Sequence, residues 1–162
     1  MTIAQMFLPE FEMEMTTTRR LLERVPDGKG DWKPHVKSFS LAHLSQLVAR
    51  MPAWITNIVQ ETKLDLSAGT PYSTETTATL LAEFDGNVAG AKAAIAATSD
   101  ADFQVNWSLT MGERVLMTMP RVAVVRQTIN HLVHHRGQLT VYLRLLDVPL
   151  PSIYGPTADE RW

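Results

Sequence analysis

The sequence contains no cysteine. This absence excludes disulfide bonds, a cysteine nucleophile and thiolate metal ligands at once. Structural zinc sites are commonly closed by several thiolates, so a site of that kind is excluded as well. Any reactive sulfur must therefore arrive on a cofactor or on a substrate.

Long apolar runs and an excess of positive charge are also missing. No segment approaches the about 20 consecutive apolar residues that span a bilayer, and residues 1–5 lack the layout of a secretory signal. We therefore expect a cytoplasmic protein that does not bind membranes. The 15 basic and 17 acidic side chains give a net charge of -2, and the longest basic cluster is the pair Arg19 and Arg20. A nucleic-acid partner is not expected from such a charge distribution.

The regular spacing of apolar residues predicts an all-α fold. The 162 residues fit one domain, 1–162, which is long enough to bury a proper core. Capping signals include Ser40 for the second helix and Ser73 or Thr74 for the third, and Pro52 is expected to kink the second helix. The pattern predicts an antiparallel-type four-helix bundle with helices near 3–25, 40–62, 74–98 and 121–146.

A change of period interrupts the helical pattern before the fourth helix. Apolar and polar residues alternate over 103–111, Gly112 can turn the chain, and 115–119 form a second apolar segment. This pattern predicts a small β-hairpin between the third and fourth helices. The tail after Val148 is rich in proline and glycine, so we expect it to lie extended over the bundle.

The densest chemical signal lies in the fourth helix, where three of the five histidines occur within five residues. At about 100° per residue, His131 and His135 fall within about 40° of one another and one turn apart, so both can hold one ion. Leu132 and Leu139 lie beside them on the stripe that should meet the core. We therefore expect the pair to face the protein interior.

The histidine pattern leaves alternatives open. His134 points about 60° away from His131 and about 100° from His135, which favours a position at the rim of the site, but the spacing also permits a His131 and His134 pair. Histidine pairs at this spacing also occur without metal, as solvated or singly hydrogen-bonded residues.

A third ligand is needed, because zinc and similar ions usually take at least three protein ligands. His43 lies about 40° from Leu47 and about 20° from Trp54 on the wheel of the second helix, so it borders the core side of that helix. It is a candidate for the third ligand. The alternative is a histidine at the edge of the core that bonds to a backbone carbonyl.

Several motifs along the chain resemble the DinB/YfiT-like proteins, the damage-inducible family. The likeness spans nearly the whole sequence and rests on Trp32-Lys33-Pro34-His35, His43, Trp107, Gly112, Asn130-His131, His135-Arg136-Gly137-Gln138-Leu139 and Pro151-Ser152-Ile153-Tyr154-Gly155. The resemblance implies a four-helix bundle that holds zinc or nickel through one histidine of the second helix and two of the fourth. Matched position by position, these are His43, His131 and His135, with His134 and His35 outside the ligand set. It also implies a homodimer, and distant relatives use low-molecular-weight thiols such as bacillithiol or mycothiol.

Two functions are consistent with such a site. Three neutral imidazoles and an open position are typical of a catalytic metal, which turns a bound water or a substrate thiol into a nucleophile. The first hypothesis is therefore a metal-dependent thiol transferase or hydrolase with a small-molecule substrate. Arg50 could hold a substrate carboxylate and Tyr142 could hydrogen-bond a ligand, although polar packing explains both equally well. The alternative is a non-catalytic dimeric stress or sensor protein that binds metal or a ligand, favoured by the lack of an obvious acid–base carboxylate near the histidines.

Overall fold

The computed structural model describes residues 1–69, 71–73 and 76–161. Its elements follow the chain in this order: α1 (Ile3–Leu22), α2 (Leu41–Gln60), β1 (Lys63–Asp65), a 3-10 helix η1 (Leu66–Ala68), α3 (Thr77–Ala97), α4 (Asp100–Phe103), β2 (Asn106–Met111), β3 (Arg114–Pro120) and α5 (Arg121–Leu145). The predicted all-α bundle with a hairpin before the last long helix is confirmed. Within the described part of the chain, no helix is both long and apolar enough to cross a membrane.

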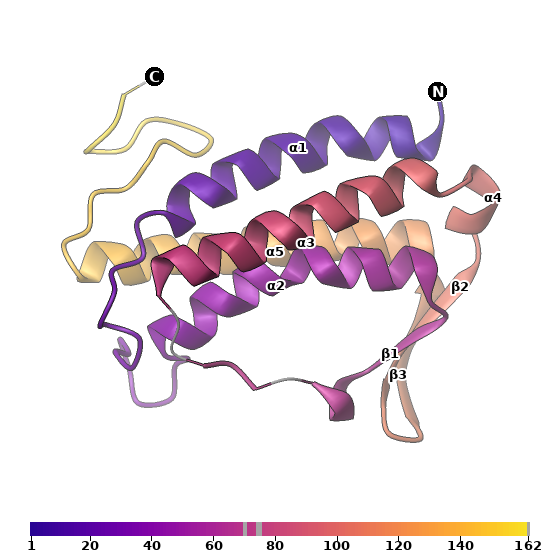
Figure 1. The fold of residues 1–162 in the computed structure, drawn as a ribbon, viewed down its shortest axis with the longest axis horizontal. Helices are drawn as coiled ribbons and strands as arrows, with labels where there is room; N and C mark the ends of the chain where they lie inside the picture. The colour runs from indigo at the N-terminus through magenta and orange to yellow at the C-terminus, as the bar shows by residue number, and fades with distance from the viewer. Residues whose placement is uncertain (70, 74–75, 162) are drawn as a thin grey trace.

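Four long helices form the bundle, with α1 and α2 each packed against both α3 and α5. Figure 1 shows the small sheet at one end of the bundle and the C-terminal tail at the other. The shared interior is filled by side chains that are at most 1% exposed, among them Phe11, Leu44, Phe84 and Ile129. Figure 1 also shows α2 changing direction along its length, as expected from Pro52 inside it.

The direction of the helices differs from the predicted antiparallel order. In Figure 1, α1 and α5 run one way along the bundle, while α2 and α3 run together in the opposite direction. The reason is the long connection between α2 and α3, whose described residues 61–69 and 71–73 return along the bundle to the end where α2 began. This connection contributes to the site described below.

The helix ends differ from prediction for local reasons. The chain leaves α1 at Leu22, because Arg24 and Val25 donate their backbone N–H groups to carbonyls three residues back, 3.0 and 3.1 Å away, in tighter turns. The third long helix starts at Thr77 with Thr76 as its N-cap, in place of the predicted Ser73 or Thr74, of which Thr74 lies outside the described residues.

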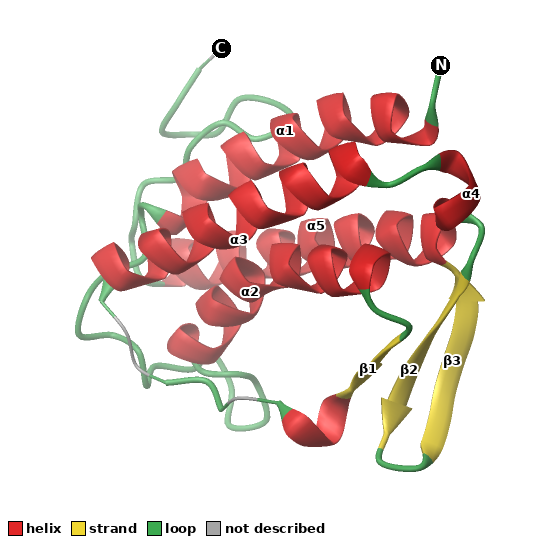
Figure 2. Ribbon diagram, turned by 45° about the vertical axis from the view of Figure 1, so that its right-hand side comes forward, coloured by secondary structure: helices red, strands yellow, loops and turns green. Residues whose placement is uncertain are grey.

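The sheet, shown in yellow in Figure 2, has strand order β1-β2-β3, with β1 parallel and β3 antiparallel to β2. The hairpin turn uses Gly112 at φ 58°, a left-handed conformation that favours glycine. The sequence missed β1, because a strand of only three residues leaves no readable alternation. It also assigned Phe103 to a strand, whereas Phe103 is the last residue of α4, which Ser99 caps.

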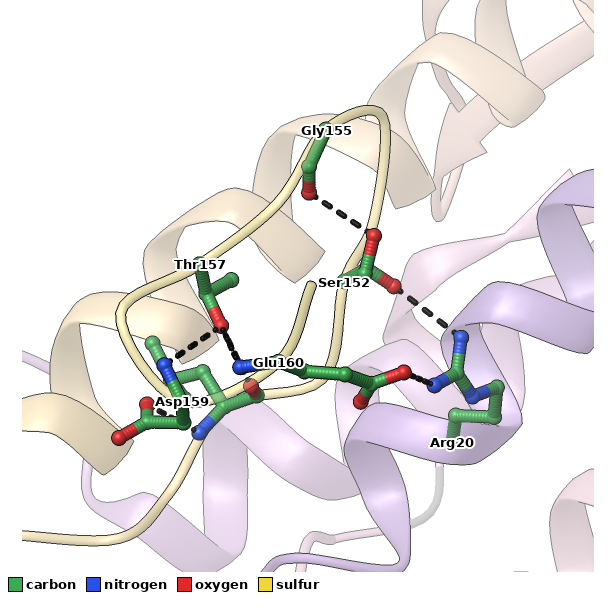
Figure 3. Close-up of polar contacts among 7 residues, drawn as sticks. Arg20, Ser152, Gly155, Thr157, Asp159 and Glu160 are labelled. Atoms are coloured by element: carbon green, nitrogen blue, oxygen red, sulfur yellow. Dashed lines mark hydrogen bonds and ion pairs between the residues drawn. The ribbon is translucent and has the colours of Figure 1, made fainter. Parts of the chain in front are cut away.

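The C-terminal tail after α5 contains neither helix nor strand in its described part, 146–161, as expected from its composition. Figure 3 shows how its polar groups attach it to α1: the Arg20 guanidinium donates to the carbonyl oxygen of Ser152, 3.2 Å away, and pairs with Glu160. The hydroxyl of Thr157 accepts from the backbone N–H groups of Asp159 and Glu160 at 3.2 and 3.0 Å, which closes the loop on itself.

Candidate metal centre

His131 and His135 meet on the surface of α5. Their Nε2 atoms are 2.9 Å apart and their ring centroids are separated by 4.6 Å. Two nitrogen ligands bound to one zinc ion at the usual distances are separated by about 2.9–3.4 Å, depending on the angle at the metal. The pair therefore already has a spacing that suits two ligands of one ion.

Gln138 fixes the orientation of one ring of the pair. Its Oε1 atom lies 2.7 Å from Nδ1 of His135, three residues earlier on the same helix. An amide oxygen only accepts, so Nδ1 carries the proton and Nε2 of His135 keeps its lone pair for His131 or for a metal. Such a partner on the far nitrogen is the usual device that orients a histidine ligand.

The pair lies at the edge of the bundle, so the expectation that it faces the interior is wrong. His131 is exposed and His135 half-buried, whereas Leu132 and Leu139 beside them are 1% and 0% exposed. The core stripe of α5 is displaced by one position from the histidine face. The pair remains open to a ligand from outside.

His43 lies beside the pair but does not join it in this arrangement. Its ring is stacked between Phe39 and Tyr72, with both centroids 4.1 Å away. No group of three or more His, Asp or Glu side chains that could hold an ion occurs within the described ranges. The structure therefore brings two members of the predicted trio together and leaves the third in an aromatic stack.

The other two histidines stand outside the pair. The ring of His134 meets that of His135 edge-on at 5.0 Å, and no short contact between ring nitrogens is shown between His134 and His131. His35 is exposed in the loop before α2, where its Nδ1 accepts from the backbone N–H of Lys37 at 3.1 Å. Of the spacings left open by the sequence, the geometry favours His131 with His135.

All three candidate ligands have environments that favour the neutral imidazole. Burial lowers the pKa of His43, and positive charge on His135 and Lys33 lowers it further. The pKa of His131 is also lowered, first because the bundle partly covers its ring and then by positive charge on His135 and His134, and that of His135 falls through partial burial in spite of its bond to Gln138. Neutral imidazole is the form that binds metal.

Arg50 and Tyr142 both have structural partners. The Arg50 side chain pairs with Glu83 at 2.7 Å, donates to the carbonyl oxygen of Pro71 at 3.1 Å and lies over the ring of Tyr72. The Tyr142 hydroxyl donates to the carbonyl oxygen of Phe39 at 3.2 Å. In this arrangement both side chains hold the segments that carry the aromatic rings around His43, and their roles toward a substrate stay predictions.

Two residues that surround His43 have no signal in the sequence. Phe39 and Tyr72 lie in loops, where no helical or strand period marks them. The loop that carries Tyr72 is held by Gln46, a buried residue of α2 whose Oε1 accepts from the backbone N–H of Ser73 at 2.8 Å. A buried glutamine one turn after a candidate ligand is the signal that could have indicated such a loop contact.

Two hollows flank the histidine pair. The first, the His135 hollow, has a volume of about 400 Å³ and is lined by Lys37, Ser38, Phe39, His135, Gln138, Val141 and Tyr142. The second, the His131 hollow, has a volume of about 250 Å³ and is lined by Trp54, Ile58, Leu64, Leu66, Trp107, Leu109, Met117, Val124, Gln127, Thr128 and His131. His135 therefore borders a hollow that contains a lysine and several hydrogen-bonding groups, and His131 borders a hollow that is almost wholly apolar.

Comparison with known proteins identifies the family and the fold of this chain. A model of the DinB family matches residues 1–161. The chain belongs to the DinB family. It is 29% identical over 160 residues to the uncharacterized protein YrdA of Bacillus subtilis strain 168, an alignment that covers 96% of this chain and 90% of YrdA.

Two solved structures share the fold of this DinB-family protein. A DinB-like protein of Bacillus subtilis, yjoa, superposes with a TM-score of 0.69 at 18% identity and covers 95% of this chain and 98% of its own. A DinB-like protein of Bacillus cereus ATCC 10987 gives a TM-score of 0.73 at 20% identity, with 91% and 95% covered. At these identities the likeness shows the fold alone.

Proposed function

We propose that this DinB-family protein is a metal-dependent enzyme that activates a low-molecular-weight thiol or water for transfer or hydrolysis on a small molecule. The observation that carries the proposal is the 2.9 Å approach of the His131 and His135 Nε2 atoms, with Gln138 orienting one ring, between two hollows. Zinc or nickel is the metal that we expect. When bound, the ion would act as a Lewis acid and lower the pKa of a thiol or water.

Each residue around the proposed centre would have a separate role. His131 and His135 would hold the ion in their neutral forms, with Gln138 keeping Nε2 of His135 free of a proton. His43 would be the third ligand if its ring left the stack between Phe39 and Tyr72. The His135 hollow, with Lys37 and several hydrogen-bonding groups, suits a polar thiol or water. The His131 hollow suits the molecule that is attacked.

The metal assignment is tested by metal content. Purified wild type and the single variants His43→Ala, His131→Ala and His135→Ala are loaded with zinc or nickel, dialysed and analysed by elemental analysis. We expect about one ion per chain in wild type and loss in each variant, with His35→Ala as the matched control that keeps its metal. Near-wild-type metal in His131→Ala would refute the assignment, and loss in His134→Ala instead would transfer the role to that residue.

The reaction is tested with a panel of thiols and electrophiles. Bacillithiol, mycothiol or a simpler thiol is mixed with an alkyl or benzyl halide, so that a sulfur–carbon bond forms, the carbon–halogen bond breaks and halide leaves with the bonding electrons, while the thiol proton passes to solvent. Halide release should require the metal-loaded protein and should fall in His135→Ala. Turnover of ester substrates without thiol would make hydrolysis the reaction.

One observation favours the second candidate, a non-catalytic metal- or ligand-binding stress or sensor protein. No Asp or Glu occurs among the described residues that line the two hollows, so neither hollow offers a carboxylate as a general base. Metal binding without turnover of any thiol or ester would establish this function. In either case we propose a homodimer, which light scattering on the purified protein would test.

A further inference from the structure

The His131 hollow has an apolar wall built from four parts of the chain. The α2 helix supplies Trp54 and Ile58, the η1 turn supplies Leu66, the sheet supplies Trp107 and Met117, and α5 supplies His131. Leu66 comes from the long connection between α2 and α3, so this connection contributes to the wall of the hollow.

Two buried polar side chains on this wall are already bonded within the protein, while Gln127, an exposed residue, adds a side-chain amide to the lining. Trp107 is only 3% exposed, and its indole N–H donates to Asn57 Oδ1 at 3.1 Å. The hydroxyl of Thr128 donates to the carbonyl oxygen of Val124 at 2.8 Å. An occupant of the hollow therefore meets mainly ring faces and aliphatic groups, with the imidazole of His131 and the amide of Gln127 as polar groups of the lining.

Charge separates the two hollows that border the histidine pair. The His131 hollow has no Lys, Arg, Asp or Glu among its described lining residues, whereas Lys37 lines the His135 hollow. Moving an ion into an apolar space without a partner is strongly unfavourable. The hollow beside His131 should therefore exclude charged groups and accept neutral ones.

The volume of the His131 hollow limits the size of the molecule that can bind in it. An apolar cavity of about 150 Å³ in a protein is known to bind benzene. The His131 hollow, at about 250 Å³, has room for one ring with a small substituent. Contacts between aromatic rings are favourable beyond the gain from burial, and two tryptophans line this space.

We propose that the His131 hollow binds the uncharged, single-ring aromatic part of a substrate and presents its reactive end to His131. That the occupant is a substrate rests on the proposed function, but binding of the ring to the hollow does not depend on a metal. The nucleophile and the aromatic substrate would then approach the histidine pair from opposite sides.

Binding is measured with benzyl alcohol on protein kept free of metal by a chelator, using calorimetry or the fluorescence of the tryptophans. We expect saturable binding at one site in wild type and at least tenfold weaker binding in Leu66→Glu, which places a charge at the hollow. Leu116→Glu is the matched control, because Leu116 is 42% exposed, Leu66 is 41% exposed, and Leu116 lies on β3 away from the hollow. This control should bind as wild type does.

Two further measurements keep the test decisive. Met117→Trp fills the hollow without adding charge and should also weaken binding at least tenfold, which covers the case in which Leu66→Glu does not fold. Benzoate, the charged analogue, should bind at least tenfold more weakly than benzyl alcohol. Absence of saturable binding in wild type, binding as tight as that of wild type in both Leu66→Glu and Met117→Trp, or benzoate binding as tight as that of benzyl alcohol would each overturn the proposal.

The result of the benzyl alcohol experiment can be distinguished from the result of the metal assay. Leu66→Glu should keep the metal content of wild type, since it changes no candidate ligand. If benzyl alcohol binds but His131→Ala keeps its metal, the hollow stands and the proposed metal centre falls. If the metal assay succeeds and benzyl alcohol does not bind, the metal centre stands and the aromatic substrate is refuted.

Discussion

At the scale of single residues, the aromatic stack around His43 sets the geometry of the candidate centre. Tyr72 and Phe39 hold the imidazole from both faces, so the stacked form competes with any form in which His43 binds metal. When a ligand binds only one of two forms of a protein, the population of the other form lowers its apparent affinity. If His43 is a metal ligand, as we propose, the loop residue Tyr72 therefore affects the affinity of the candidate site for metal.

The first prediction concerns Tyr72→Ala, which removes one face of this stack. Since an aromatic pair contributes about 0.5–1.5 kcal/mol, losing it should strengthen zinc binding about twofold to tenfold. A competition titration against a zinc-binding dye measures the change. Tyr72→Phe keeps the ring and serves as the control, with unchanged affinity. Equal zinc affinity for Tyr72→Ala and wild type would mean that His43 does not leave the stack to bind.

The sequence predicted part of this residue-scale arrangement. His131 and His135 were identified as a pair because a helix repeats every 3.6 residues, which fixes the spacing of residues four apart. The sequence did not show that they lie at the bundle edge, because the wheel does not say where the neighbouring helices end. It could not show Tyr72 beside His43, since that contact joins α2 to a loop about 30 residues further along the chain.

At the scale of elements, one carboxylate joins the connection after α2 to the hairpin. Asp65 at the end of β1 accepts from the backbone N–H groups of Ser67 and Gly112, each at 2.9 Å. The bonds from Ser67 and then from Gly112 lower the pKa of Asp65. The charged carboxylate is therefore the form that holds β1 and η1 against the turn of the hairpin.

The second prediction is a pH-dependent loss in Asp65→Asn. Because the folded pKa lies below the unfolded value of about 3.9, the charged form stabilises the fold above that pH, and the gain is lost as pH falls through the folded pKa. Asp65→Asn should thus be less stable than wild type at pH 7, and the two should converge at pH values below the folded pKa. Urea unfolding across this range, with amide exchange of the hairpin, measures the difference.

A charge control separates this bond from a general effect of charge. Glu113→Gln removes a negative charge from the same turn, where Glu113 is exposed. This variant should be about as stable as wild type both at pH 7 and below the folded pKa of Asp65. A constant difference between Asp65→Asn and wild type across the range would contradict a role for the ionised carboxylate.

The long helices and the hairpin were predicted from the sequence, whereas the three-residue strand β1 was missed. The four long helices have enough turns for their apolar period to show, and their predicted ends differ from the structure by a few residues where capping side chains or tighter turns intervene. The strand β1 is stabilised by pairing with β2 far along the chain, which no local pattern reveals. For the same reason the sequence did not indicate that α3 runs parallel to α2.

At the scale of the whole molecule, a buried ion pair joins the first and last helices to the tail. Arg136 of α5 and Glu14 of α1 are 2.6 Å apart, with side chains 1% and 6% exposed. The Tyr154 hydroxyl of the tail donates to Glu14 at 2.8 Å, and Arg136 also donates to the Glu14 carbonyl oxygen at 3.1 Å. Arg136 directly follows His135 in sequence, so the ion pair attaches the part of α5 that carries the histidine pair to α1.

The third prediction is that Arg136→Met destabilises the protein by about 3–5 kcal/mol, because it leaves the Glu14 carboxylate buried without its partner. The double variant Arg136→Met with Glu14→Leu removes both charges and should recover much of that loss. Chemical denaturation of wild type and the variants measures these differences. Equal stability of the single and double variants would show that the charge left behind is not the cause.

The fourth prediction treats the metal as a tie between α2 and α5. An ion that binds the folded chain alone raises the free energy of unfolding by about 2.7 kcal/mol when its free concentration is a hundred times the dissociation constant. If His43 is a ligand, His43→Ala weakens binding, and a hundredfold weaker constant at the same zinc concentration leaves an increment of only about 0.4 kcal/mol. Denaturation with and without zinc, on wild type, His43→Ala and the control His35→Ala, measures the increment. An undiminished increment in His43→Ala would mean that α2 supplies no ligand and that the ion is held by α5 alone, with the two bundle helices joined only through their packed side chains.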